Sequence, residues 1–133
     1  MGRRYRMITI HLNDILNSIP IFRTLSNQAL PIKVAYQVAR LIRELDAEST
    51  TFDESRRQII EKYAEREDTG EYKQTDEGNI IIQPDKMEDC NREMTELLET
   101  TIEINAEPLN INEFVNVELT PAQMLSLEPF FEA

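Results

Sequence analysis

A long stretch without glycine or proline, residues 32–68, is the feature that most constrains the fold of this chain. Large apolar residues recur in it every seven positions, at Val38, Leu45, Phe52 and Ile59. A second set steps between them with alternating spacings of three and four: Ala35, Ile42, Ser49, Arg56 and Tyr63. Such a seam is typical of a helix that packs along one face. One helix from about Pro31 to Glu67 would extend roughly 50 Å at about 1.5 Å per residue.

The two halves of this seam differ in their surroundings. The first half is flanked by further apolar residues, at Ile32, Val34, Ala39 and Leu41. The second half keeps only a thin stripe, which Ser49 and Arg56 interrupt. We therefore expect the first half to be buried on several sides in a core and the second half to project from it.

A short strand and a bent helix are predicted before this long helix. Residues 7–12 are rich in β-forming side chains that alternate loosely, which favours a strand. Asn13 has a side-chain oxygen suited to capping the helix that follows. Pro20 lies about two turns into that helix, so the helix should kink or end there.

A β-hairpin and a second seam follow the long helix. Residues 70–75 and 79–83 flank Asp76-Glu77-Gly78, and Gly78 can adopt the positive φ that a tight turn requires. Asp85 and Glu88 then form a predicted capping box for a helix with apolar residues at Met87, Cys90, Met94, Leu97 and Thr101. Because the hairpin separates the two helices, we expect them to pack antiparallel, with Met87 near Tyr63.

The C-terminal part of the chain contains an edge strand and two capping signals. Residues 101–105 alternate in polarity and are predicted to pair with residues 7–12. Asn112 is a candidate cap for a short turn. Thr120-Pro121-Ala122-Gln123 combines a capping threonine, a proline at the first helical position and a glutamine at the third.

These elements predict an α+β, mainly helical fold. Its parts are a long antiparallel helical hairpin, a β-hairpin at the tip and a small two-stranded sheet at the base. At 133 residues, residues 1–133 are expected to form a single domain. Met7 is a plausible natural start, so residues 1–6 are predicted to be a flexible basic extension.

Charge is segregated along the sequence. Residues 1–43 carry seven basic residues and one acid, a formal charge of +6, whereas the remainder carries −17 of the total of −11. Arg3, Arg4 and Arg6 resemble a nucleic-acid-binding arm, but their pairing with acidic residues of the same or a neighbouring chain is the favoured interpretation. With a pI near 4.5, the composition argues against direct nucleic-acid binding and indicates a protein partner.

The sequence offers little catalytic or metal-binding chemistry. His11 is the only histidine and Cys90 the only cysteine. His11 is interpreted as a structural or surface histidine, and Cys90 as a small apolar residue on the seam of its helix. The phosphate-binding loops and nucleophile motifs of common enzymes do not occur, and with three glycines in total a phosphate cradle is difficult to build. We therefore predict no enzyme activity, no cofactor and no metal site.

Candidate partner-binding residues come from two places in the chain. One is the acidic surface of the helix that follows the hairpin, and the other is the aromatic pair near the C-terminus, which could equally close the core. Together they are Glu88, Asp89, Glu93, Glu96, Glu99, Phe130 and Phe131. Self-association is also expected, through the part of the long helix that the shorter helix does not cover. No apolar run approaches the roughly 18 residues of a membrane span.

Several segments in order resemble a known family. These are residues 30–42, Phe52-Asp53-Glu54-Ser55-Arg56, residues 60–63, and residues 117–122 followed by 125–130. The chain resembles a family of small uncharacterised proteins encoded by tailed bacteriophages of Gram-positive bacteria and their prophages. The resemblance covers most of the chain from about Leu12, and residues 3–6 fall outside it. Its motifs are structural, so it implies no functional residues.

The resemblance implies a non-enzymatic phage protein that acts through protein–protein contacts, in virion (tail or particle) morphogenesis or as an accessory factor. Its expected place is the cytoplasm of the infected cell or the virion. The alternative is an acidic inhibitor that imitates the charge of nucleic acid and blocks a nucleic-acid-binding host defence protein.

Overall fold

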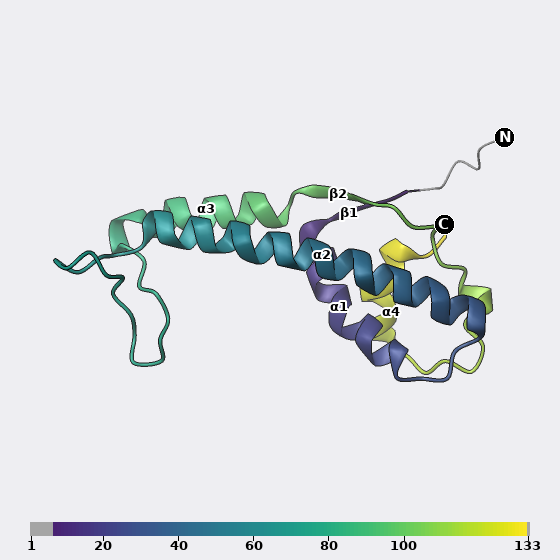
Figure 1. Ribbon diagram of the computed structural model, residues 1–133. Helices are drawn as coiled ribbons and strands as arrows, with labels where there is room; N and C mark the ends of the chain where they lie inside the picture. The colour runs from purple at the N-terminus through teal and green to yellow at the C-terminus, as the bar shows by residue number, and fades with distance from the viewer. Residues whose placement is uncertain (1–6, 133) are drawn as a thin grey trace. The chain divides into compact units, whose positions relative to one another are not determined.

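The computed structural model describes residues 7–132, and the predicted basic extension at residues 1–6 lies outside them. The described chain is mainly helical with one small antiparallel sheet, as the sequence predicts (Figure 1). Its four α-helices are α1 (Leu12–Ser26), α2 (Ile32–Tyr63), α3 (Met87–Leu98) and α4 (Pro121–Leu127). The sheet pairs β1 (Ile8–His11) with β2 (Thr101–Ile104). Single 3-10 turns occupy Pro84–Lys86, Ile111–Glu113 and Glu128–Phe130.

Contacts within the chain divide it into two compact units. Unit 1 comprises residues up to Ser49 together with those from Thr100 onward, and unit 2 is Thr50–Glu99. α2 contributes its first part to unit 1 and its remainder to unit 2.

The sheet of unit 1 confirms that the strand near the N-terminus pairs with the strand that follows α3. β1 and β2 are antiparallel, with Ile8 opposite Ile104 and Ile10 opposite Ile102. Ile8 and Ile10 are buried, whereas Thr9 between them is exposed. This alternation is what a strand with one face on a core requires.

α1 differs from the prediction at both its start and its middle. It begins directly after β1, where the Leu12 N–H donates to the Thr100 carbonyl at 2.9 Å. Its N-cap is His11, without a side-chain cap, so Asn13 does not cap it. Pro20 lies inside an uninterrupted helix. Pro20 is exposed and lacks the N–H of one helical hydrogen bond, and the packing of Phe22 and Leu25 in the core keeps the helix continuous past it.

The core of unit 1 is built from one face of α2 against α1, the sheet and the C-terminal segment. α2 contributes the buried residues Val34, Val38, Leu41 and Leu45, at helical spacing. They belong to the same cluster as Phe22 and Leu25 of α1 and Leu127 of α4. The prediction that the first half of α2 is buried on several sides is wrong, however, because Ile32, Ala35 and Ala39 are exposed.

Local capping determines the ends of the C-terminal elements. The predicted capping box of α4 is confirmed: the Thr120 hydroxyl accepts from the Gln123 N–H, and the Gln123 side chain accepts from the Thr120 N–H. Asn112 is not a cap. Instead, the side chain of Asn110 accepts from the Asn112 N–H at 3.0 Å.

Unit 2 contains α3, the tail of α2 and the segment between them. Among its described residues only Ala64 and Cys90 are buried, while Phe52, Ile59 and Tyr63 of the α2 seam are half-buried. α3 follows the 3-10 turn at Pro84–Lys86 and has no side-chain cap, so the predicted Asp85–Glu88 capping box is wrong. Unit 2 therefore has helices without a substantial apolar core of its own.

The segment between α2 and α3 is irregular (Figure 1). In place of the two predicted strands it has isolated antiparallel bridges, at Ala64–Ile82, Arg66–Tyr72 and Gln74–Ile80. The Thr75 N–H donates to the Asn79 carbonyl at 2.8 Å around the expected turn. Gly78 has a φ of +86°, as that turn requires.

Candidate protein-binding surfaces

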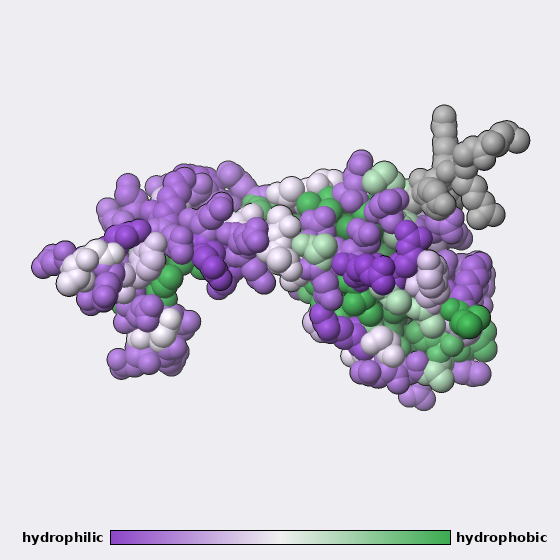
Figure 2. All heavy atoms as spheres, viewed as in Figure 1, coloured by the Kyte–Doolittle hydropathy of each residue, from purple (hydrophilic) through white to green (hydrophobic). Residues whose placement is uncertain are grey.

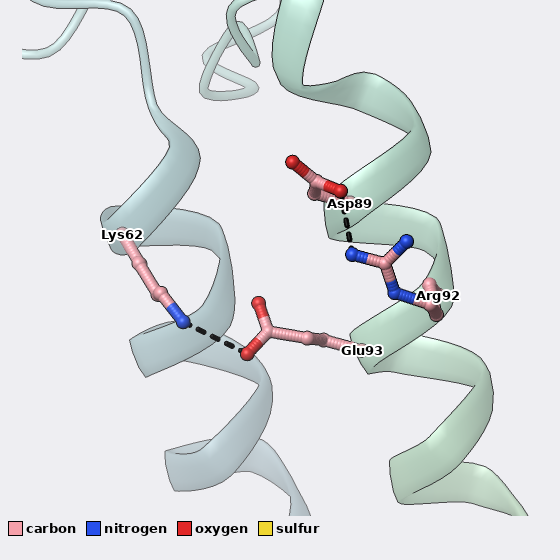
Figure 3. Close-up of polar contacts among 4 residues, drawn as sticks. All are labelled: Lys62, Asp89, Arg92 and Glu93. Carbon is pink, nitrogen blue, oxygen red and sulfur yellow. Dashed lines mark hydrogen bonds and ion pairs between the residues drawn. The ribbon is translucent and has the colours of Figure 1, made fainter.

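An ion pair joins α2 and α3 within unit 2 (Figure 3). Lys62 Nζ lies 2.9 Å from Glu93 Oε1, and on α3 itself Arg92 Nη2 lies 2.6 Å from Asp89 Oδ1. The neighbouring Tyr63 hydroxyl and the Lys62 ammonium lower the pKa of Glu93, because they favour its charged form. The pKa of Lys62 is raised, first by Glu93 and then by Tyr63. These contacts hold the tail of α2 to α3 through polar groups.

The five candidate acids, four on α3 and Glu99 directly after it, differ in exposure and in pairing. Glu88, Glu96 and Glu99 are exposed, whereas Asp89 and Glu93 are half-buried and paired with Arg92 and Lys62. Unit 2 carries fifteen acids and seven bases, a formal charge of −8. Figure 2 shows mostly hydrophilic surface over this unit. Asp89 and Glu93 are therefore engaged in contacts within unit 2, and exposure alone distinguishes the other three acids from them.

The two candidate aromatic residues are in different environments. Phe130 is fully buried and meets Phe22 edge to face, with ring centroids 4.9 Å apart. Phe131 is half-buried and lies 5.2 Å from the ring of Phe114. Phe130 thus closes the core, and Phe131 alone of the pair reaches the surface.

Phe131 lines a groove of about 840 Å³ in unit 1. Its apolar walls come from Ile111, Pro121, Met124, Leu125 and Pro129, and Glu128 and Glu132 are its charged residues. Leu125 is 69% exposed and Ile111 is 56% exposed. No signal in the sequence predicted this groove, because apolar residues on a short helix are more often part of the core. Of Met124, Leu125 and Leu127, only Leu127 is buried, since α4 is too short to bury more than one face.

Basic residues of the N-terminal segment pair with acids inside unit 1. Arg23 Nη2 lies 2.8 Å from Asp46 Oδ1, and Lys33 Nζ lies 2.9 Å from Glu113 Oε1. The pKa of Lys33 is raised mainly by Glu113 and further by Glu107 and Glu132. The favoured interpretation of Arg3, Arg4 and Arg6 stays a prediction, because these three residues lie outside the described part of the chain.

The residues considered for chemistry have ordinary surroundings. His11 is exposed at the end of β1. Cys90 is buried, and burial raises the pKa of its thiol, which keeps it protonated and unreactive at neutral pH. Across residues 7–132 no three His, Cys, Asp or Glu side chains gather as metal ligands would. In that same range no helix is both long and apolar enough to cross a membrane.

In comparisons with known proteins, no protein-family model, no curated protein and no solved structure matches this chain. The family resemblance therefore rests on the sequence segments alone.

Proposed function

We propose that this chain is a non-enzymatic protein that acts through protein–protein contacts. The apolar groove of unit 1 is the observation that carries this proposal. Its walls expose Leu125 and Ile111 beside the half-buried Phe131. Large apolar side chains gathered around one concave surface are typical of a binding site, whereas scattered single ones need no explanation.

Charge at the groove indicates the kind of partner. Glu128 and Glu132 are exposed, and no Lys or Arg occurs between Thr100 and the C-terminus. A protein segment with an apolar side chain for the groove and flanking basic residues would complement both features. Carboxylates at such a rim mainly speed encounter and fix orientation, while the buried apolar contact supplies affinity.

The family resemblance supports a biological setting for this binding. A small phage-encoded protein with a partner-binding groove fits a role in virion morphogenesis or as an accessory factor, in the infected cell or on the particle.

Copurification from phage-infected cells tests the proposal. The tagged chain should capture virion proteins, and Leu125→Ser should lose them, because it removes an exposed apolar side chain from the groove without opening the core. Val115→Ser is the matched control, since Val115 is 57% exposed and lies outside the groove. Equal recovery with the two variants would contradict the groove as the binding site.

A second candidate function has its own observation. The excess acid of unit 2 favours an inhibitor that occupies the basic cleft of a nucleic-acid-binding defence protein. Glu88 and Glu96 on α3 and Glu99 directly after it are exposed. In the same copurification, recovery of a host nuclease or its guide complex would support this function. Changing these three residues to Gln should then slow association, most strongly at low salt.

A further inference from the structure

The first part of α2 exposes a second apolar stripe. Ile32 is 90% exposed and Tyr36 is 66% exposed, and Ala35 and Ala39 beside them are exposed as well. Successive residues of an α-helix are rotated by about 100° around its axis. Ile32, Tyr36, Ala39 and Arg43 therefore lie on the side of α2 opposite the buried Val34, Val38, Leu41 and Leu45. Solvent-facing helix positions usually carry charged residues, so large apolar side chains one turn apart on this face are a candidate contact surface.

We propose that this stripe binds the same stripe of a second copy of the chain, with the two α2 helices antiparallel and the two-fold axis between Tyr36 and Ala39. A two-fold contact of this kind requires a surface that complements itself. In this register Tyr36 faces the partner's Ala39, so a large side chain meets a small one. Ala35 and Ala39 also allow close approach of the two helices.

Charge along α2 favours the antiparallel arrangement. No acid occurs between Ile32 and Arg43, and Arg40 and Arg43 lie at one end of the stripe. At the other end Lys33 Nζ lies 2.9 Å from Glu113 Oε1, and Glu107 and Glu132 also raise the pKa of Lys33, so this end of the stripe carries an excess of acid. An antiparallel pair places Arg40 and Arg43 near these acids of the partner. A parallel pair would instead bring the arginines of both copies together.

The stripe is short, which sets the expected affinity. About three turns of helix bury less than the ~1,200–2,000 Å² of a standard interface, so we expect association at micromolar concentrations. The stripe does not include Leu125, and this inference goes beyond the proposed function. Self-association and groove binding can therefore be tested separately.

Sedimentation over a range from micromolar to near-millimolar protein tests the dimer. The chain should shift from monomer to dimer, and Tyr36→Glu should weaken association by about tenfold or more, as expected for a central aromatic contact. Arg43→Glu should also weaken it. Leu125→Ser is the control and should leave association unchanged. A monomer at every concentration, or a Tyr36→Glu variant that associates as the unchanged protein does, would overturn the proposal.

Disulfide trapping tests the register. A mixture of Tyr36→Cys and Ala39→Cys chains should form a mixed disulfide, because the two positions face each other. Ile32→Cys alone should not link to itself, since antiparallel pairing separates the two copies of this position by roughly 16 Å along the axis. A disulfide needs Cα atoms about 4.4–6.8 Å apart. Efficient self-linking of Ile32→Cys would show a parallel pair and refute the arrangement.

Discussion

Removing the Phe130 side chain should be among the most damaging substitutions in this protein. The ring is fully buried, contacts Phe22 edge to face at 4.9 Å and ties the C-terminal segment to the core of unit 1. Replacing a buried Phe by Ala lowers the free energy of unfolding by about 3–5 kcal/mol. An edge-to-face aromatic pair contributes about 0.5–1.5 kcal/mol, which is lost with the ring. Total stabilities are commonly about 5–15 kcal/mol. Phe130→Ala therefore removes a large share of the stability.

Urea denaturation followed by far-ultraviolet circular dichroism measures this effect. With a denaturant slope of about 2 kcal/mol per molar urea, a loss of about 4 kcal/mol lowers the midpoint by about 2 M. Phe131→Ala and Phe52→Ala are matched controls, because both rings are only half-buried. Their midpoints should fall clearly less. If Phe130→Ala and Phe131→Ala shift the midpoint equally, the proposed division between a core ring and a surface ring is wrong.

Three further predictions concern local contacts. The pKa of Glu93 is lowered, so the stabilisation by its charged form is present above its ordinary pKa of 4.5 and is lost as pH falls below it. In the Glu93→Gln variant the free energy of unfolding should therefore fall less between neutral and acidic pH. The protein should be dilute in this measurement, because proteins associate readily near their pI, here about 4.5. Thr120→Ala should cost about 1 kcal/mol in denaturant titrations, because it removes the α4 cap. In amide hydrogen exchange, unit 2 should exchange faster than the core of unit 1; equal protection would show one cooperative domain, as the chain length predicts.

The elements that sequence reasoning predicted correctly are those that local chemistry determines. The α2 helix follows from a long stretch of helix-compatible residues, and the Thr120 cap follows from a motif whose partners are three residues apart. Alternation of polarity predicted β1 and β2 as strands. Their pairing joins segments far apart in the sequence, and it was predicted correctly because these were two short strands without another partner nearby.

Other predictions failed where distant residues compete with local signals. Asn13 has a capping side chain, but the Leu12 N–H already bonds to the Thr100 carbonyl, so the helix begins earlier. Pro20 was expected to bend or end α1, yet packing of Phe22 and Leu25 outweighs the one missing hydrogen bond. No local pattern contains this tertiary information.

The charges that are segregated along the sequence are not segregated in the same way between the two folded units. The basic N-terminal residues and the acidic C-terminal segment fold into the same unit 1, where Lys33 pairs with Glu113. Unit 1 carries seven bases and ten acids, a formal charge of −3, so the net acidity resides mostly in unit 2 at −8. Of the predicted candidate residues, only the acids of α3 belong to that more acidic unit.

Two adjacent faces of α2 are both apolar, which is why the sequence did not predict the exposed stripe at Ile32 and Tyr36. The predicted seam runs through Ala35, Val38 and Ile42, whereas the buried face runs through Val34, Val38 and Leu41. The two faces share Val38, and they differ by a rotation about the helix axis smaller than the step between neighbouring residues. Apolar spacing alone cannot choose between them when residues 32–42 contain so many apolar side chains. The burial of Val34 and exposure of Ala35 make the choice. Ile32 and Tyr36 then fall on the outer face. The dimer proposed here therefore uses the same half of α2 as the predicted self-association, but a different face of the helix from the predicted seam.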